Sequence, residues 1–474
     1  MIFKFLLRLF FAGALLLTSS FSVELNAQDT TRISLLFTGD IMGHDSQIAD
    51  AYDDSDGKYD YTRCFRFVRP YLESADLTIG NLEVTLAGPP YKGYPQFSSP
   101  DELAVALKEV GFDVLVTANN HCVDRGVKGI RRTINVLDSL DIPHTGTFVD
   151  EVDRLNNYPL MLQRNGFTIA LLNYTYGTNG IPVPSPAIVN GLDTAIISED
   201  VLAAKEKNPD AIIAFVHWGV EYENLPRKNQ KDLTAFFFKN GVNLVIGAHP
   251  HVLQPMEWNK ETNQLVVYSL GNFVSGQRKR YTDGGAMAYV ELQKVRYKPD
   301  SIVTSIDSAG HFLEWVYRTA DAKKEYYILP VTSFEKDSTG FIKDEPSKLA
   351  FKTFVEDSRL LYGKNNLYVS EINENPKDTL VTYKVQVAAP EYKDDSLNTV
   401  LLNTIDPFFG YEVIVSDNSD PVIMVGPFAD QSKAEEVCHR LNEEGRSAQV
   451  QKYLNGELVV ETPQARDIVP QNIR

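Results

Sequence analysis

Five segments of this chain place histidine, asparagine or carboxylate side chains directly after a short apolar run that is typical of a buried strand. The clearest is Gly247-Ala248-His249-Pro250-His251, which follows the apolar residues 242–246. Open α/β sheets gather ligands at the carboxyl ends of their strands, so side chains that follow successive strands are expected to share a site. Two imidazoles on one such turn indicate a metal centre, because imidazole is the commonest protein ligand for zinc, iron and related ions.

The other four segments repeat this arrangement. Asp40 follows residues 33–37, Glu83 follows residues 77–79, Asn119-Asn120-His121 follow residues 114–116 ahead of Asp124, and His217 follows residues 212–216 ahead of Glu221 and Tyr222. Each signal is weak alone, since a histidine after a strand is more often a hydrogen-bonded core or loop residue and paired asparagines are common in turns. Together they predict one shared site. Two ions roughly 4 Å apart in such a site can bind both the attacking and the leaving oxygen of a phosphoryl or related transfer.

The region between residues 33 and 292 alternates short apolar runs with amphipathic stretches. Strands are expected at residues 33–37, 77–79, 114–116, 168–172, 212–216, 242–246 and 265–268, and helices at residues 100–110, 127–140 and 231–239. This alternation predicts an α/β or layered αββα body with a largely buried sheet. Further strands expected at residues 312–317 and 326–331 complete a domain over residues 28–345.

A second, smaller unit is expected towards the carboxyl end. Residues 346–361 have helical spacing, and the Asn-rich stretch 363–379 predicts a linker, so residues 346–380 are assigned to a helix and linker. Strands at residues 383–388, 422–425 and 448–452 with a helix at 432–442 favour a ferredoxin-like α+β sandwich over residues 381–455. Residues 456–474 are expected to form a tail.

Residues 1–27 have the features of a signal peptide. Lys4 and Arg8 accompany an apolar run through Leu17, and Leu25-Asn26-Ala27 resembles a cleavage site before Gln28. An uncleaved anchor is the alternative, but the run is shorter than the ~20 residues that cross a bilayer. The mature chain is therefore expected to be exported to the periplasm or cell envelope, without a transmembrane segment.

Charge and cysteine content argue against a nucleic-acid partner and against a disulfide-stabilised fold. The net charge of -17 argues against nucleic acid as a partner, because neutralising phosphates requires a basic surface. The 3 cysteines, Cys64, Cys122 and Cys438, are odd in number and far apart, so a disulfide framework does not stabilise the fold.

Six ordered motifs over residues 33–280 resemble those of the CapA family, which is named for poly-γ-glutamate capsule synthesis. They are Gly39-Asp40-Ile41-Met42, Asn81-Leu82-Glu83, Asn119-Asn120-His121 with Asp124 and Gly126, His217-Trp218-Gly219 with Glu221-Tyr222, Gly247-Ala248-His249-Pro250-His251 with Gln254, and Ser269-Leu270-Gly271-Asn272-Phe273. CapA proteins are similar in fold to the calcineurin-like metallophosphoesterases. The resemblance thus implies a four-layer αββα sandwich with a dinuclear metal centre.

The resemblance also implies roles for single residues. The implied ligands of one or two divalent transition metal ions, such as manganese, iron or zinc, are Asp40, Glu83, Asn120, His217, His249 and His251. His121 would be the general acid or would polarise a substrate oxygen. Residues in accessory positions are Asn119, Asp124, Glu221, Tyr222 and Asn272, the last in a turn whose role is expected to be structural.

One position departs from the phosphoesterase pattern. Those enzymes often carry Asp-x-His in the first motif, whereas this chain has Asp40-Ile41-Met42. One ion would then be weakly held, or His44 would substitute from two residues further on.

The carboxy-terminal unit resembles a SPOR domain through Tyr383-Lys384-Val385-Gln386-Val387 and Val425-Gly426-Pro427-Phe428. SPOR domains recognise peptidoglycan glycan strands that lack stem peptides, so the resemblance implies a wall-binding role, with Gln386 and Phe428 as glycan-binding or core residues. The segment Ala388-Ala389-Pro390 departs from the commoner Gly-Ala-Phe.

Two functions remain open from the sequence. The first is an exported metal-dependent hydrolase or transferase that acts on an anionic, poly-γ-glutamate-like envelope or capsule polymer and is held at peptidoglycan. The alternative is a non-catalytic assembly factor that binds such a polymer and keeps a structural or vestigial metal site. The six implied ligands and His121 favour chemistry.

Overall fold

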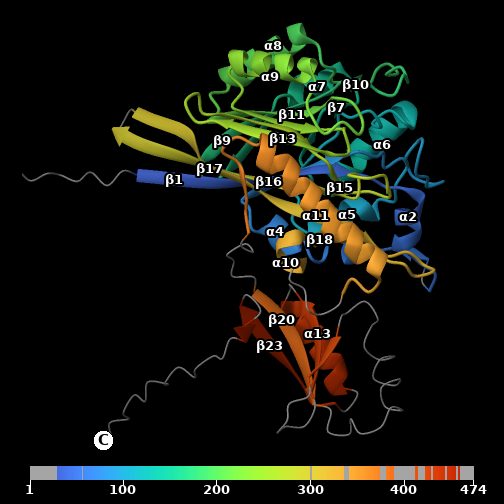
Figure 1. Ribbon diagram of the computed structural model, residues 1–474. Coiled ribbons are helices and arrows are strands. Elements are labelled where there is room, and N and C mark those ends of the chain that lie inside the picture. Colours follow the sequence, from blue (N-terminus) through green and yellow to red (C-terminus); the bar gives the residue numbers. More distant parts are fainter. Residues whose placement is uncertain are drawn as a thin grey trace, which may run out of the picture.

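The computed structural model describes a main unit over residues 29–55, 57–298, 301–335 and 341–373 (Figure 1). It also describes residues 381–388, 411–414, 422–428, 431–443, 446–454 and 457–458 of the carboxy-terminal unit. The expected signal peptide, residues 1–27, lies outside the described residues.

The first sheet of the main unit is mixed and is built around β1 (Asp29–Ile41). Its order is β18-β17-β16-β1-β4-β5-β6, with β15 paired to β1 and β19 paired to β17. Strands β1, β4, β5 and β6 run parallel, whereas β16, β17 and β18 continue the sheet antiparallel. The bounds are β4 (Leu77–Leu82), β5 (Val114–Val116), β6 (His144–Thr145), β15 (Asn272–Val274), β16 (Gly284–Lys298), β17 (Ser301–Arg318), β18 (Tyr326–Pro330) and β19 (Ser370–Glu371).

The second sheet has the order β13-β14-β12-β11-β9-β8. Its four inner strands are parallel and the two edge strands are antiparallel to their neighbours. Every residue of β11 is buried, which is typical of a parallel strand covered on both faces. The bounds are β8 (Leu160–Arg164), β9 (Phe167–Thr175), β11 (Ala211–His217), β12 (Leu244–Ala248), β13 (Leu253–Asn259) and β14 (Gln264–Leu270).

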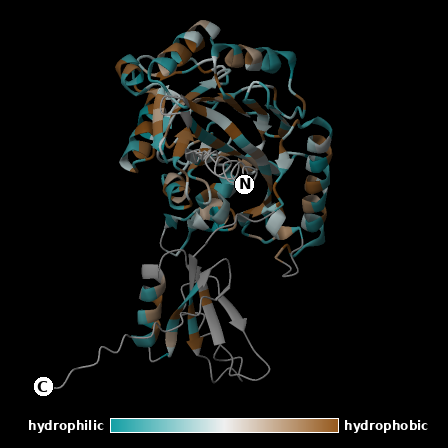
Figure 2. Cartoon of the chain, turned by 90° about the vertical axis from the view of Figure 1, so that its left-hand side faces the viewer, coloured by the Kyte–Doolittle hydropathy of each residue, from teal (hydrophilic) through white to brown (hydrophobic). Residues whose placement is uncertain are grey.

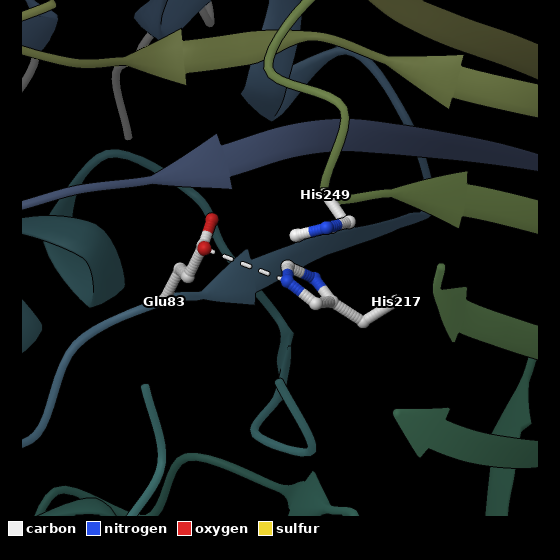
Figure 3. A group of neighbouring side chains, drawn as sticks. All are labelled: Glu83, His217 and His249. Atoms are coloured by element: carbon white, nitrogen blue, oxygen red, sulfur yellow. Dashed lines mark ion pairs between the residues drawn. The ribbon is translucent and has the colours of Figure 1, made fainter. Parts of the chain in front are cut away.

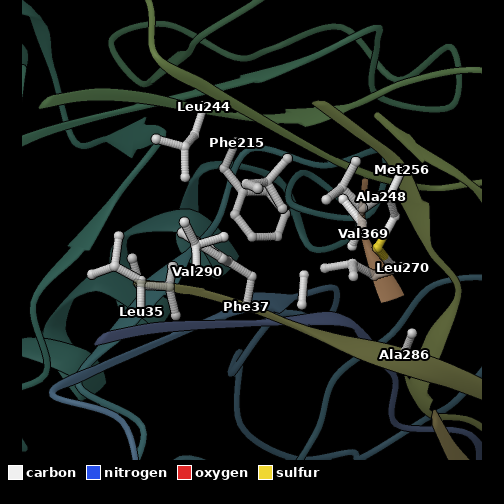
Figure 4. Packing of buried hydrophobic residues seen from close by; sticks show 14 of the residues in the cluster. Leu35, Phe37, Phe215, Leu244, Ala248, Met256, Leu270, Ala286, Val290 and Val369 are labelled. Atoms are coloured by element: carbon white, nitrogen blue, oxygen red, sulfur yellow. The ribbon is translucent and has the colours of Figure 1, made fainter. Parts of the chain in front are cut away.

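The two sheets pack face to face on one apolar core. Leu35 and Phe37 of β1 lie opposite Phe215 of β11 and Leu244 of β12, and all four are buried (Figure 4). Burying a side chain of this size is worth about 1.5–3 kcal/mol each, so the inter-sheet contact is a main source of stability. It also fixes the carboxyl ends of strands from both sheets next to one another.

Helices cover the outer faces of both sheets, which gives four layers. On the first sheet, Phe65, Leu103 and Leu107 pack with Leu36 of β1, and on the second, Val201 and Phe237 pack with Leu172 and Ala214. The outer helices carry both hydrophilic and hydrophobic stretches in Figure 2, as expected for helices with one buried face. The bounds are α2 (Asp45–Ala51), α3 (Thr62–Phe65), α4 (Arg69–Glu73), α5 (Glu102–Glu109), α6 (Gly126–Ser139), α7 (Glu151–Asn157), α8 (Thr194–Glu206), α9 (Lys228–Asn240) and α10 (Val331–Phe334), with short strands β2 (Tyr52–Asp53), β3 (Lys58–Tyr59), β7 (Thr147–Phe148) and β10 (Ile188–Val189).

Helix α11 (Glu345–Asn365) closes one side of the main unit. Its Phe351, Phe354 and Tyr362 enter the core between the sheets, and it contacts β13 and β17. The expected linker at residues 363–379 is wrong for its first part, because the helix continues to Asn365 and β19 pairs with β17. An asparagine of this stretch stabilises the fold: the Asn366 side chain accepts a hydrogen bond from the Met256 backbone N–H at 2.9 Å. Residues 374–380 lie outside the described residues.

The described part of the carboxy-terminal unit is an antiparallel sheet with the order β21-β22-β20-β23-β24 and one helix, α13. Val385 and Val387 of β20 are buried against Ala434 and Leu441 of α13. The bounds are β20 (Val381–Ala388), β21 (Tyr411–Ile414), β22 (Val422–Phe428), α13 (Gln431–Glu443), β23 (Ala448–Leu454) and β24 (Glu457–Leu458). The chain as a whole is a mixed α/β protein with several sheets.

Candidate metal centre

The side chains that follow five strands meet where the two sheets of the main unit face each other. Asp40 lies in β1, His217 ends β11, and Glu83, Asn120 and the His249/His251 pair follow β4, β5 and β12. Pairing fixes their relative positions, since Asp40 is in register with Asn81 and His217 with Ala248. All six predicted ligand side chains are buried.

The first group of donors consists of Glu83, His217 and His249 (Figure 3). The Oε1 atom of Glu83 lies 3.5 Å from the Nε2 atom of His217. The rings of His217 and His249 have their centroids 4.8 Å apart, and the buried Nδ1 of His249 has no hydrogen-bond partner among the described residues. One carboxylate oxygen and two ring nitrogens therefore point at the same small space.

The second group consists of Asp40, His251 and again Glu83. The Nδ1 atom of His251 lies 3.0 Å from Asp40 Oδ2 and 3.0 Å from the amide oxygen of Asn272. A proton on Nδ1 satisfies both acceptors, which leaves the lone pair on Nε2, 3.8 Å from Glu83 Oε1. Glu83 is thus shared between the two groups, as a bridging carboxylate would be.

The chemistry of these donor residues suits divalent metal ions. Both oxygens of Glu83 are buried without a hydrogen-bond partner among the described residues. Burial, and next the charge of Asp40, raise the pKa of Glu83 well above its usual range. Two adjacent buried carboxylates are costly unless a cation compensates them. The donor atoms of each group lie within 4.8 Å of one another, somewhat wider than ligands bound to one ion at about 2.0–2.2 Å, so small side-chain movements would complete each group.

Burial favours the neutral, metal-binding form of two imidazoles of the site, those of His217 and His249. Burial lowers the pKa of His249 to about 3, with His251 adding to the shift, and burial also brings the pKa of His217 well below its usual range. Burial alone would raise the pKa of Asp40, but the hydrogen bond and charge of His251 lower it to about 2.

The backbone of the histidine turn is strained. His249 has a φ of 100° and His251 a φ of 56°, values that residues other than glycine rarely adopt. Strained positions of this kind cost about 1–3 kcal/mol each and cluster at functional sites. In this conformation His249 lies beside Glu83, and His251 lies beside Asp40 and Glu83.

His121 stands beside the two groups and is paired with Asp124. Its Nδ1 lies 2.8 Å from Asp124 Oδ2, which also accepts the backbone N–H of Phe97 at 2.7 Å. Asn119 braces the segment: its amide oxygen accepts the His121 N–H, and its NH₂ group donates to the Leu82 carbonyl at 2.8 Å. Asp124 therefore orients the His121 ring, and Asn119 supports its backbone.

The matches to known proteins cover this same region. Residues 34–277, slightly more than half of the chain, match the family described as bacterial capsule synthesis protein PGA_cap. The chain belongs to the PGA_cap family. This confirms the family expected from the six ordered motifs.

Curated relatives carry matching descriptions. The chain is 30% identical over 280 residues to the capsule biosynthesis protein CapA of Bacillus anthracis, covering 56% of this chain and 65% of that protein. It is 32% identical over 240 residues to the PGA biosynthesis protein CapA of Bacillus subtilis (strain 168), covering 48% of this chain and 61% of that protein. The chain thus spans less than two thirds of either relative.

Solved structures offer only distant likenesses. A 5'-nucleotidase from Candida albicans has a TM-score of 0.34 at 11% identity, covering 69% of this chain and 58% of that chain. A hypothetical protein from Thermus thermophilus has a TM-score of 0.32 at 14% identity, covering 58% of this chain and 98% of that chain. These scores are too low to assign an activity.

Within the described residues of this PGA_cap protein, no helix combines the length and apolarity needed to traverse a bilayer.

Two residues at the first motif of this PGA_cap protein stay outside both donor groups. Met42 is buried in the apolar core that lies between the first sheet and its helices. His44 is in neither group, and its Nδ1 accepts the Gly276 backbone N–H at 3.1 Å and lies 3.2 Å from Gln47 Oε1. Its ring and that of His121 both contact Phe97 edge-on.

Three other accessory residues surround His251. Asn272, besides its contact to His251 Nδ1, donates to the Thr282 carbonyl at 2.8 Å and so ties the histidine turn to the loop after β15. Tyr222 has its ring centroid 6.4 Å from that of His251, and the neighbouring Glu221 is exposed. Asn272 therefore supports a candidate ligand, whereas Glu221 and Tyr222 lie at the rim.

Sequence reasoning assigned no role to three residues that contact the centre, Asn81, Tyr176 and Asn179. Asn81 donates to Asp40 Oδ1 at 2.8 Å and lies 3.2 Å from His217 Nδ1. Asn120 binds His217 Nε2 through its amide oxygen at 2.8 Å and donates to Asn179 at 3.2 Å. Tyr176 places its ring 4.5 Å from that of His249. Asn179 and Tyr176 follow β9, so the strand-end rule itself was the signal that could have found them.

In the carboxy-terminal unit, Gln386 lies on the face of β20 opposite α13, since its neighbours Val385 and Val387 face the helix. Its amide oxygen accepts hydrogen bonds from Gln449 at 3.1 Å and from Gln451. The Phe428 side chain lies outside the described residues, although the backbone of that residue pairs with Tyr383.

Proposed function

We propose that this chain is an exported metal-dependent enzyme of the hydrolase or transferase type, which acts on an anionic, poly-γ-glutamate-like polymer of the envelope or capsule. Export is inferred from residues 1–27. The family and the description of the Bacillus subtilis relative as a PGA biosynthesis protein favour such a polymer.

One observation carries the proposal. Glu83 is buried between two donor groups without a hydrogen bond among the described residues, and His121, which is paired with a carboxylate, is close enough to His217 and His249 to contribute to lowering their pKa values. A structural metal site needs no such histidine, and a structural histidine needs no such shared carboxylate. The combination is that of a reacting centre.

The ions would be held by Asp40, Glu83 and His251 in one group and by Glu83, His217 and His249 in the other, with the Asn120 amide oxygen beside the second. When bound, a divalent transition metal supplies Lewis acidity towards a carbonyl or phosphoryl oxygen of the substrate.

Side chains of the protein would transfer the proton, hold the ligands in place and contact the substrate. Asp124 fixes Nδ1 of His121 as a hydrogen-bond donor, so Nε2 is the atom that exchanges a proton with a substrate oxygen or nitrogen. Asn81 holds Asp40 and His217 in place through one NH₂ group. Tyr176, about half exposed beside His249, offers an aromatic face to the substrate.

Turnover tests the assignment of His121. Full-length protein is assayed on poly-γ-glutamate and on a generic phosphodiester, and His121→Gln is expected to lower the rate at least about 100-fold at unchanged metal content. His144→Gln is the matched control, because His144 bonds to the Ile142 carbonyl away from the site. Equal rates for the two variants would show that His121 has no catalytic role. A metal-loaded protein without turnover on either substrate would favour the role of an assembly factor.

We further propose that the carboxy-terminal unit holds the protein at peptidoglycan, as a SPOR domain would. The sheet face with Gln386, Gln449 and Gln451 supports this, because amide groups pair well with sugar hydroxyls.

A further inference from the structure

A pocket of about 300 Å³ lies between helix α11 and the loops that follow β11 and β15. Helix α11, the orange helix that crosses the main unit in Figure 1, forms one wall with Phe354, Leu361 and Lys364. Asn224 and Tyr281 come from the two loops. The volume is at the lower end of the range for sites that take small organic ligands.

The lining of this pocket is mixed. Leu253, Phe354 and Leu361 give it an apolar floor, while Asn224, Tyr281 and Lys364 bring polar atoms to it. Such a lining suits a ligand unit with a short aliphatic stem and a charged head.

The charge around the pocket is opposite to that of the whole chain. Lys364 is exposed, and so is Lys279 on the neighbouring loop, and neither makes an ion pair with a carboxylate of the described residues. Arg280 is already paired with Asp357 of α11 at 2.9 Å. In a protein of net charge -17, two uncompensated ammonium groups at one pocket form a local attraction for carboxylates.

The pocket adjoins the metal centre along three segments. Lys279 stacks its ammonium group 3.8 Å from the ring centroid of Tyr222, the same ring that lies 6.4 Å from His251. The lining residues Asn224, Tyr281 and Leu253 each come two positions after Tyr222, Lys279 and His251, respectively. Two residues span at most about 7 Å, so one extended chain molecule can reach both places.

We propose that this pocket is a second binding subsite, which takes a carboxylate-bearing unit of an acidic chain molecule while a neighbouring unit of the same molecule lies at the metal centre. Lys279, held over Tyr222, binds a carboxylate between the two places, and Lys364 binds the carboxylate of the unit in the pocket. This inference rests on the proposed function, because it assumes a polymeric acidic substrate at that centre.

Binding of a labelled probe to the full chain tests the subsite. The probe is a fluorescent decamer of γ-linked glutamate, its neutral counterpart is the glutamine decamer, and fluorescence anisotropy measures Kd. Lys364→Glu reverses the charge at the rim and Leu361→Trp fills the floor, and each is expected to raise Kd about fivefold to tenfold. Lys364 is exposed, so its variant keeps the fold even if the core substitution does not.

Two controls lie on the same helix outside the pocket. Lys352→Glu and Leu349→Trp change exposed residues of α11 and are expected to leave Kd within about twofold. Equal effects of Lys364→Glu and Lys352→Glu, or equal affinity for the two decamers, would overturn the subsite.

The metal centre is varied separately. His249→Ala is expected to lose metal and turnover while the Kd of the glutamate decamer stays within about threefold. A wild-type protein without metal or turnover would therefore defeat the proposed function and leave the subsite readout intact. Decamer binding that responds to His249→Ala and not to Lys364→Glu would defeat the subsite alone.

Discussion

Glu314 of β17 is the second buried carboxylate of the main unit whose oxygens have no hydrogen-bond partner among the described residues. Its side chain lies against Gly285 of the neighbouring strand, at a position where a Cβ atom would come within 2.6 Å of Glu314 Oε1. Burial raises the pKa of this carboxyl well above its usual range. Burial therefore favours the protonated form of Glu314, whereas Glu83 lies beside ring nitrogens of His217, His249 and His251 that can bind a cation together with it.

Glu314→Gln is expected to flatten the pH dependence of stability. The folded chain keeps a proton on Glu314 that the unfolded chain releases above its usual pKa of 4.5, so the free energy of unfolding falls as pH rises from there. The fall is at most about 1.4 kcal/mol per pH unit. Thermal unfolding of wild type and variant between pH 4 and 8 measures the difference.

The control for Glu314 is Glu356→Gln, which changes an exposed carboxylate on α11. The gain in Tm of Glu314→Gln over wild type should grow with pH, and that of Glu356→Gln should not. A gain that stays constant from pH 4 to 8 would show that Glu314 is not protonated in the folded chain.

At the scale of elements, the turns around the metal centre depend on glycines that let backbones touch. A Cβ atom on Gly39 would overlap the carbonyl oxygen of Gly271, and one on Gly247 would overlap that of Tyr268. These contacts bring β1 against the β14–β15 turn and β12 against β14. They set the positions of Asp40 and of the histidine turn.

Gly39→Ala is expected to destabilise the fold by at least about 1–3 kcal/mol and to weaken metal binding, because overpacking here moves Asp40. Gly191→Ala is the control, since nothing lies within 4 Å of a Cβ atom there. Urea unfolding and metal content measure both effects. If Gly39→Ala kept both the wild-type midpoint and the metal, the close approach would have no role.

The elements show what the sequence could predict and what it could not. The runs at residues 114–116 and 212–216 became β5 and β11 nearly unchanged, because buried parallel strands are continuous apolar runs. The hairpin β16–β17 was predicted only at residues 312–317, since its outer half alternates exposed and buried residues weakly. Asn366 looked like a linker residue because its bond to Met256 depends on tertiary contact.

The candidate site was likewise predicted only in part from the sequence. Residue types with few roles, such as two histidines one residue apart after a strand, were recognised, and the fold brings all six predicted ligand residues into one buried region. Asn179 and Tyr176 were not recognised although they follow a strand, because asparagine and tyrosine in a loop have many uses, and their contacts to Asn120 and His249 form only in the folded chain.

At the scale of the whole molecule, the proposal gives the two units separate tasks, with chemistry in the main unit and attachment in the carboxy-terminal unit. Gln386→Ala is expected to reduce binding of the full chain to denuded glycan strands by roughly tenfold, because an amide pair with sugar hydroxyls is lost. Co-sedimentation measures the bound fraction.

The matched control for Gln386 is His439→Ala, which changes an exposed residue on α13, the helix on the other face of the sheet. Its binding should equal that of the wild type. Equal sedimentation of the two variants would show that this sheet face does not bind glycan. A wild-type chain that stayed in the supernatant would show that the protein does not bind glycan strands at all.

The metal content of the purified full chain tests the central claim most directly. Elemental analysis is expected to find one or two equivalents of a divalent transition metal per chain, and Glu83→Gln is expected to lose most of it because both donor groups share that carboxylate. A His44→Gln variant should keep the metal, since His44 lies outside both groups. A wild-type chain that folds and is free of metal even after incubation with manganese, iron and zinc would contradict the account.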